Sequence, residues 1–310
     1  MAAERAAGSR AVSGDLHPAR LSVGVVGAGR AGTAMAVALA RAGHTVVAAS
    51  AVSQASRDRV RRSLPGVPVE PPEQVVAAAD LILLTVPDDV LPGLASGLAA
   101  TGAPLSGRLL AHASGRHGLA VLEPAARRGA LPLALHPVMT FTGRPDDADR
   151  IVGSTFGVTA PEPLRLVAEA LVVEMGGEPV FIAEEDRGLY HAALANAANH
   201  LITLVTASAD LLREASVPEP ARMLGPLLRA ALDNALSLGD AALTGPVARG
   251  DADTVAEHVQ AISKVSPAAL GAYLALARLT ADRALAAGLL SAANAQRLLA
   301  VLGNASGPAP

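Results

Sequence analysis

The sequence predicts an α/β fold in which a doubly wound parallel sheet is followed by an all-helical domain. Short apolar runs alternate with helical stretches from residue 21 to about residue 183, a glycine-rich turn follows the first run, and only helical patterns continue to about residue 302. Parallel strands that are covered on both faces are near-continuous apolar runs, as the run at 80–87 with its LILL centre is. The 310 residues suffice for two domains, each with its own core.

The expected strands are short apolar runs separated by turns or helices. They lie at 21–27, 44–50, 67–69, 80–87, 108–114, 131–137, 153–160 and 177–183. Helices are expected at 31–43, which Gly43 ends, and at 161–175, between the last two strands. This alternation of strands and helices is typical of a parallel sheet with helical crossovers.

The predicted domain boundaries follow from this change of pattern. We expect a dinucleotide-binding domain at 21–183 and a helical domain at 184–303. Residues 1–20 lack the apolar core of a secretory signal, so we expect a disordered leader there, and a disordered tail at 304–310.

Composition excludes several classes of function. The formal net charge is −3, and no basic stripe with interleaved aromatic residues occurs, so nucleic-acid binding is not expected. Cysteine is absent, which excludes disulfides, thiolate nucleophiles and thiolate-bound metals. No uncharged apolar run reaches the roughly 18 residues of a membrane span, and no His, Asp and Glu group has ligand spacing. We therefore expect a cytoplasmic protein without a metal or a membrane partner.

The first strand runs into a glycine turn with the spacing Gly27-x-Gly29-x-x-Gly32, with Arg30 and Ala31 between the last two glycines. Gly27 permits the tight turn, Gly29 leaves room for a pyrophosphate, and Gly32 lets the helix and strand pack closely. The N-terminus of the helix offers free N–H groups to an anion. A plain strand-to-helix turn is the alternative, but the position between a strand and a helix favours a dinucleotide site.

The end of the second strand favours NADP(H) over NAD(H). An NAD site usually carries an acidic residue there, for the ribose 2′-hydroxyl. This sequence has Ser50 instead, followed by Ser53 and Arg57, and Arg30 lies in the glycine turn. Hydroxyl and guanidinium groups suit a 2′-phosphate. The alternative is that Arg57 is simply a solvated helix residue.

Polar residues follow three of the strands, where ligands of a doubly wound sheet bind. Val86 and Pro87 end one strand and are expected to border the nicotinamide, while Ser114 and His136 follow or end the next two. Ser114 could instead form a turn, and His136 a structural His-Pro corner. For the neighbouring His112 the structural interpretation is favoured.

The stretch from Tyr190 to Leu204 is a helix that is apolar nearly all round and therefore looks buried. It nevertheless carries His191, Asn196, Asn199 and His200, which occupy one half of the helical wheel. Buried amides need partners. We expect those partners to be a substrate, although hydrogen bonds to neighbouring helices would also satisfy them.

These segments resemble a family that joins a Rossmann-like NADP-binding domain to a helical domain of unknown function, number 2520. The resemblance covers Leu21 to about Leu302 and rests on the sequences GVVGAGRAG, LILLTVPDDVL, HASG, HPVMTF, YHAALANAANHL and LTGPVARGD. That family is similar to ketopantoate reductases, pyrroline-5-carboxylate reductases and β-hydroxyacid dehydrogenases. The resemblance implies a 6-phosphogluconate-dehydrogenase-like arrangement and a homodimer formed through the helical domain.

The similarity to ketopantoate reductase implies roles for individual residues. If the second asparagine of that enzyme's helix is matched to Asn199, its catalytic lysine falls on His191 and its first asparagine on Ala195. Histidine therefore replaces lysine. HASG resembles the substrate loop of the dehydrogenases and implies that Ser114 lies near a substrate carboxylate.

The resulting hypothesis is an NADPH-dependent reduction of a small 2-oxo acid, with ketopantoate as the first candidate. His191 would donate the proton, with His136 as the alternative acid, because an unperturbed imidazole has a pKa of about 6.5. Asn199 would polarise the carbonyl, Asn196 would contact the substrate, and Ser114 or Arg249 would anchor its carboxylate. Arg249 could equally be structural. The competing interpretations are a pyrroline-5-carboxylate- or prephenate-type oxidoreductase and a non-catalytic NADP-binding sensor.

Overall fold

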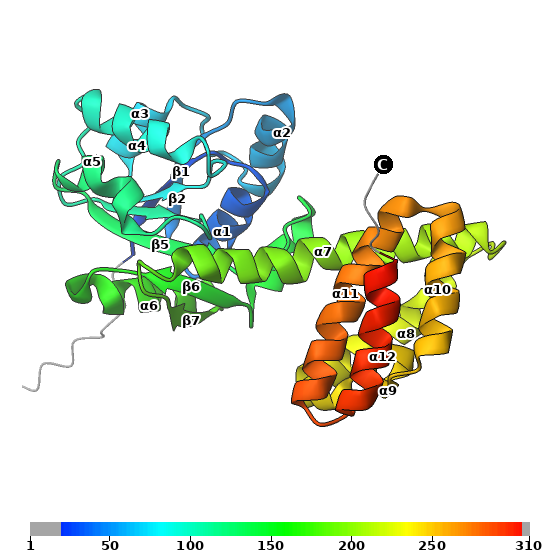
Figure 1. Cartoon of the computed structure of the whole chain (residues 1–310). Helices are drawn as coiled ribbons and strands as arrows, with labels where there is room; N and C mark the ends of the chain where they lie inside the picture. Colours follow the sequence, from blue (N-terminus) through cyan, green and yellow to red (C-terminus); the bar gives the residue numbers. More distant parts are fainter. Residues whose placement is uncertain (1–19, 306–310) are drawn as a thin grey trace, which may run out of the picture. The chain divides into compact units, whose positions relative to one another are not determined.

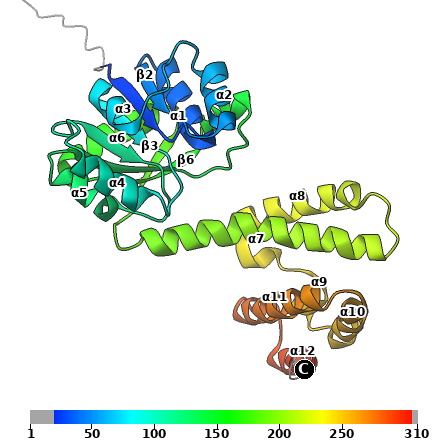
Figure 2. The same ribbon diagram turned by 90° about the horizontal axis from the view of Figure 1, so that it is seen from above.

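The computed structural model describes residues 20–305, which form two compact units. One unit ends at Ala195 and the other begins at Asn196, so the division falls inside the long helix α7, Arg187–Glu214. Figures 1 and 2 show α7 as one uninterrupted helix. The predicted leader up to residue 19 and the predicted tail from residue 306 lie outside the described residues.

The first unit is built on a seven-stranded sheet with the order β2-β1-β3-β4-β5-β6-β7. The strands are β1 Ser22–Val26, β2 Thr45–Ser50, β3 Leu81–Leu84, β4 Leu109–His112, β5 Leu131–Pro137, β6 Thr155–Thr159 and β7 Glu178–Phe181. Every neighbouring pair is parallel except β5 and β6. The doubly wound sheet is thus confirmed, but the expectation that it is parallel throughout is wrong for β6.

The chain between β5 and β6 explains this exception. A parallel connection needs a crossover, usually a helix, whereas residues 138–154 contain only the short 3-10 turns η2, Pro145–Asp147, and η3, Asp149–Ile151. The connection therefore stays at the carboxyl edge of β5, and β6 runs back. The expected strand at 67–69 is also wrong: Val69 makes only an isolated bridge to Ala49, because Pro68 has no N–H for a longer ladder.

Helices cover both faces of the sheet (Figure 1). On one face lie α1, Arg30–Arg41, α2, Gln54–Ser63, and α6, Arg165–Glu174, and on the other lie α3, Pro72–Ala78, α4, Leu91–Ala100, and α5, Glu123–Ala126. Each apolar strand feeds both cores. In β3, for example, Leu81 and Leu83 pack under α1, whereas Ile82 and Leu84 pack under α3 and α4.

The second unit is entirely helical. After α7 come α8 Pro220–Leu238, η5 Gly239–Ala242, α9 Gly245–Arg249, α10 Ala252–Val265, α11 Pro267–Ala286 and α12 Ala292–Asn304. The last four helices share a core that includes Val255, Ala281 and Leu298. After the LTGPVARGD segment, Asp251 caps α10 by accepting the N–H of Thr254. Within residues 20–305, no helix is long and apolar enough to cross a bilayer.

Candidate functional site

The glycine turn has the geometry that each of its glycines was predicted to need. Gly27 has φ +90°, and a Cβ there would lie 2.7 Å from a methyl group of Val86. A Cβ on Gly32 would lie 2.0 Å from Oγ1 of Thr85. That hydroxyl donates to the carbonyl of Gly27 at 2.8 Å and closes the turn onto β3. Both glycines are therefore required by close packing.

Gly29 differs, because a Cβ there would meet only the carbonyl of Gly27, at 3.7 Å. It is the N-cap residue of α1 and makes no side-chain cap hydrogen bond. The first N–H groups of a helix have no intrahelical partner, so those of Arg30, Ala31 and Gly32 remain available. Open space over a glycine, next to uncapped N–H groups, fits the pyrophosphate of a dinucleotide.

The turn after β2 carries the residues expected to choose between NADP(H) and NAD(H). Ser50 is buried, and its carbonyl accepts the N–H groups of Gly27 and Ala28. Ser53 is exposed and caps α2, and Arg57 is exposed with Nε donating to the carbonyl of Ala51. Two hydroxyl groups and a guanidinium therefore border the end of β2, next to the glycine turn. Val86 and the exposed Pro87 follow the adjacent β3.

At the carboxyl ends of β4 and β5, two of the predicted site histidines meet over a glycine. A Cβ on Gly115 would lie 2.9 Å from Nε2 of His136 and 2.8 Å from Cδ2 of His191. The two rings are nearly perpendicular, with centroids 6.4 Å apart. Tyr190, which precedes His191 on α7, places its hydroxyl 2.7 Å from Nδ1 of His136. These groups all belong to the first unit.

Burial determines the protonation of this cluster. Burial, followed by the nearby charges of Arg187 and His191, lowers the pKa of His136 to about 4. Burial also raises the pKa of Tyr190. At neutral pH the imidazole of His136 is therefore neutral and the phenol keeps its proton. If the Tyr190 hydroxyl donates to Nδ1, the single proton of the neutral His136 ring lies on Nε2, beside Gly115.

Arg187 lies next to this cluster and binds the backbone of β5 and β6. Its role was not predicted from the sequence. Its side chain is almost fully buried, with 2% of its surface exposed. The guanidinium donates to Oγ1 of Thr159 at 2.7 Å and to the carbonyls of Gly157 and Ala134 at 3.0 and 3.3 Å. It follows three acidic residues in the sequence, a pattern that is more typical of a solvated side chain. Only the packing of α7 on β5 and β6 reveals that it is buried.

The loop after β4 is shaped by His112, as the structural interpretation predicted. Nδ1 of His112 accepts the N–H of Ser114, and Nε2 lies 2.8 Å from the carbonyl of Gly118. Burial lowers the pKa of His112 to about 4, so the ring stays neutral. Ser114 itself is buried, and its hydroxyl accepts the N–H of His117. The hydroxyl of Ser114, which was predicted to bind the substrate, is therefore engaged in a hydrogen bond within its own loop.

The predicted residues beyond Ala195 belong to the helical unit. Asn196, Asn199 and His200 are exposed, so the expectation of a buried helix is wrong for this part of α7. Oδ1 of Asn196 lies 2.8 Å from Nδ1 of His200, one helical turn away, which supplies that amide with a local partner. Arg249 ends the short helix α9 and is also exposed. The apolar residues of α7 around Asn199 are also exposed, because no other helix in the described part of the unit packs over them.

Two family models match the chain and together span both of its parts. Residues 7–137 match the Rossmann-like domain, and residues 154–280 match the domain of unknown function DUF2520. The chain therefore joins a Rossmann-like domain to a DUF2520 domain. The resemblance noted from the sequence is thus confirmed. Among curated proteins, no sequence matches this Rossmann–DUF2520 chain.

Solved structures share the fold of the Rossmann–DUF2520 chain at low sequence identity. A candidate NADP oxidoreductase from Bacteroides fragilis is 20% identical with a TM-score of 0.71, covering 85% of this chain and 98% of its own. An imine reductase from Myxococcus stipitatus in complex with NADP+ is 16% identical with a TM-score of 0.63, covering 90% and 99%. The pyrroline carboxylate reductase of Plasmodium falciparum with NADP bound is 13% identical with a TM-score of 0.53, covering 92% and 97%.

Proposed function

We propose that the protein is an NADP(H)-dependent oxidoreductase that reduces the carbonyl group of a small 2-oxo acid. The observation that carries this proposal is the convergence of His136, His191 and Gly115 at the carboxyl ends of β4 and β5. In a doubly wound sheet this edge is where ligands bind. The glycine turn after β1 opens at the same edge, and its shape suits a dinucleotide. The fold shared with NADP-binding reductases agrees with this assignment.

Each part of the cofactor has a candidate partner in the first unit. The uncapped N–H groups at the start of α1 would hold the pyrophosphate, and Ser50, Ser53 and Arg57 would surround the 2′-phosphate. When bound, NADPH supplies the hydride, and the protein supplies position and a proton. Val86 and Pro87, at the end of β3, would border the nicotinamide.

We assign the proton donation to His191, which is half-buried and lies against Gly115. His136 is neutral and is held by Tyr190, which suits it to a different role. Its Nε2–H would donate a hydrogen bond to the substrate oxygen without giving up its proton. This assignment makes His136 a hydrogen-bond donor and leaves His191 as the acid.

Roles for the remaining predicted residues stay part of the proposal. The loop that contains Ser114 would lie next to a substrate carboxylate. The hydroxyl of Ser114 itself already accepts the N–H of His117. Asn199 would polarise the carbonyl, and Asn196 and Arg249 would contact the substrate. All three are exposed, and Asn196 would have to exchange its bond to His200 for one to the substrate.

The first substrate to test is ketopantoate. A second candidate is a cyclic imine that carries a carboxylate, because imine and pyrroline carboxylate reductases share the fold. The test is oxidation of NADPH, and of NADH in parallel, with ketopantoate, other 2-oxo acids and pyrroline-5-carboxylate. Turnover of a 2-oxo acid with a preference for NADPH supports the proposal. Binding of NADPH without turnover of any substrate supports a sensor instead.

We also propose that the chain forms a homodimer through its helical unit. Helix α8 has 19 residues, of which only Pro220 and Leu224 are buried. Large apolar side chains are exposed along α7 and α8, among them Ile202, Met223, Leu227, Leu236 and Leu238. A large exposed apolar surface of this kind is typical of a protein–protein interface. We expect the dimer to act in the cytoplasm.

A further inference from the structure

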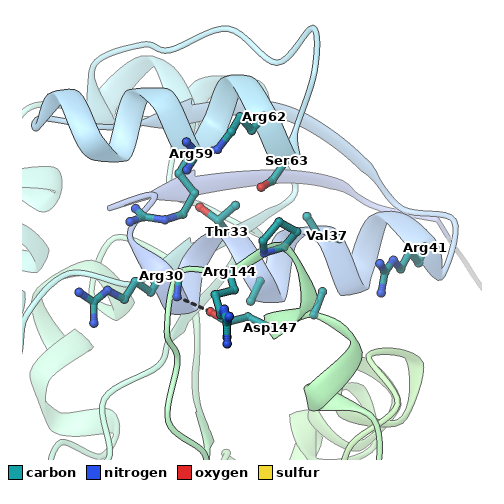
Figure 3. Close-up of a pocket in the computed structure, with 13 residues that line it drawn as sticks. Arg30, Thr33, Val37, Arg41, Arg59, Arg62, Ser63, Arg144 and Asp147 are labelled. Carbon is teal, nitrogen blue, oxygen red and sulfur yellow. Dashed lines mark hydrogen bonds between the residues drawn. The ribbon is translucent and has the colours of Figure 1, made fainter.

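A cavity lined by arginines lies on the α1 face of the first unit. Its walls are one face of α1, the second half of α2, and the connection between β5 and β6. The volume is about 230 Å³, and the charged residues in the lining are Arg30, Arg41, Arg59, Arg62, Arg144 and Asp147. Figure 3 shows Arg30 and Arg59 at one end of this arginine pocket and Arg41 at the other.

The acidic group in the arginine pocket is already engaged. The buried carboxylate of Asp147 accepts the N–H and the hydroxyl of Thr142, at 3.1 and 2.9 Å, and the N–H of Gly143 at 2.6 Å. Arg41 is likewise engaged, in an ion pair with Asp149 at 2.6 Å. Asp147 therefore fixes the loop that forms one wall and leaves the other arginines of the pocket without a carboxylate.

Those arginines, Arg30, Arg59, Arg62 and Arg144, have no side-chain hydrogen bond or ion pair with any residue between 20 and 305. Arg59 is the half-buried one, and its Nε is fully shielded from solvent without a hydrogen-bond partner. Across residues 20–305 it is the one buried side-chain nitrogen or oxygen in this condition. A buried donor on a charged group that lacks a partner is costly.

Two of the arginines also converge on the same piece of backbone. A Cβ on Gly143 would lie 3.3 Å from Cγ of Arg30 and 3.4 Å from Nη2 of Arg59. Both side chains carry a positive charge, and like charges in one pocket repel more strongly where water is excluded. An anion in the pocket would offset these charges and supply Arg59 with its missing acceptor.

We propose that the arginine pocket binds a small phosphate-bearing anion at a site separate from that of NADP(H). Guanidinium groups pair with phosphate oxygens through paired N–H groups, which a pocket with several free arginines can offer from more than one side. The pocket begins at Arg30, whose N–H belongs to the glycine turn, and extends from there along α1 to Arg41. Ser53 and Arg57, which we propose for the cofactor's 2′-phosphate, do not line it. The proposal concerns binding alone and does not depend on the proposed reaction.

The test uses inorganic pyrophosphate and the full chain, at constant ionic strength, with and without saturating NADPH. Calorimetry is expected to show binding to the wild type under both conditions. Arg59→Gln, and Arg59→Gln with Arg62→Gln, should weaken it at least about tenfold, the scale of one charge-assisted hydrogen bond. Arg128→Gln, an exposed arginine after α5 on the other face of the sheet, is the control and should bind as the wild type does. The melting temperature of Arg59→Gln should not fall, since the orphaned nitrogen is gone.

Three results would overturn the proposal. The first is that pyrophosphate does not bind the wild type, and the second is that it binds the Arg59 and Arg62 variants equally well. The third is that adenosine 2′,5′-bisphosphate, the phosphorylated end of the cofactor, displaces it, because the pocket would then belong to the NADP(H) site. If the wild type neither bound NADPH nor turned over a substrate, this would count against the proposed reaction. The pyrophosphate result would be unaffected.

Discussion

The hydroxyl of Tyr190 lies 2.7 Å from Nδ1 of His136 and joins the start of α7 to the end of β5. The phenol fits against Gly157 of β6, where a Cβ would lie 2.2 Å from its oxygen. This hydrogen bond, together with those of Arg187, holds the first turn of α7 against β5 and β6. That bond also fixes which nitrogen of His136 faces Gly115.

Replacing Tyr190 with Phe tests this arrangement. The variant keeps the ring but removes the donor to Nδ1, so the imidazole of His136 is free to change its tautomer. We expect the turnover number to fall about tenfold and stability to fall by about 1 kcal/mol, the scale of one hydrogen bond. Steady-state kinetics and urea denaturation measure the two effects. Tyr273→Phe is the matched control, because Tyr273 makes a similar bond to His258 in the helical unit; equal effects of the two variants would contradict the role.

Replacing His191 with Ala tests the proposed acid. We expect turnover to fall by about two to four orders of magnitude, the usual contribution of a general acid. NADPH affinity, measured by fluorescence, should stay the same because His191 is not placed at the glycine turn. His258→Ala removes an exposed histidine of the helical unit and should leave turnover unchanged. Full activity of His191→Ala would show that another group donates the proton.

The glycine turn can be tested with two alanine substitutions of opposite effect. In Gly32→Ala the new methyl group would lie 2.0 Å from Oγ1 of Thr85 and 2.9 Å from the carbonyl of Gly27, so α1 must move. We expect a loss of about 1–3 kcal/mol in the free energy of unfolding and weaker NADPH binding. Gly93→Ala, in α4 with nothing within 4 Å, should instead stabilise the fold by up to about 1 kcal/mol. Unchanged NADPH affinity in Gly32→Ala would argue against the cofactor site.

Stability should fall as the pH is lowered from about 6.5 to 4. Burial lowers the pKa of His112 and of His136 to about 4 in the folded protein, whereas an unfolded histidine titrates near 6.5. Between these values the unfolded chain binds more protons, so stability is complete above pH 6.5 and decreases below it. For the fully buried His112 the contribution reaches about 3 kcal/mol.

The contribution of His112 can be isolated by substitution. Denaturation curves of His112→Asn should show a smaller loss of stability between pH 6.5 and pH 4 than those of the wild type. His258→Asn, at an exposed position, should retain the wild-type slope. If His112→Asn lost as much stability with acid as the wild type, the buried neutral ring would not be the cause.

The proposed homodimer predicts a molar mass of twice 31.0 kDa, about 62 kDa, by light scattering. Leu236→Glu places a charge on α8, where the leucine is 79% exposed in the single chain. If α8 lies in the interface, this variant should dissociate. Leu166→Glu is the control, because Leu166 on α6 is also 79% exposed but belongs to the sheet unit. A monomeric wild type, or dimers that survive Leu236→Glu, would contradict the proposal.

The order of the elements and the glycine turn could be predicted from the amino-acid pattern. These features depend on local patterns: apolar runs define the strands, and the spacing of Gly27, Gly29 and Gly32 reflects sterics within a few residues. The predicted strand ends also placed His136 and Ser114 at one edge of the sheet. His191 was singled out by the polar half of its helix, and the resemblance to a catalytic position added to this.

Features that depend on contacts between distant segments of the chain become visible only in the folded protein. The return of β6, the burial of Arg187 behind acidic neighbours, and the bond between Tyr190 and His136 all arise from packing across the sheet. The exposure of Asn196 and Asn199 could not be predicted from the apolar sequence of the helix. An apolar helix can be buried by its own chain or by another one, and the sequence does not distinguish the two cases. The arginine pocket could not be predicted from the sequence either. Its arginines come from three separate segments, which only the fold brings together.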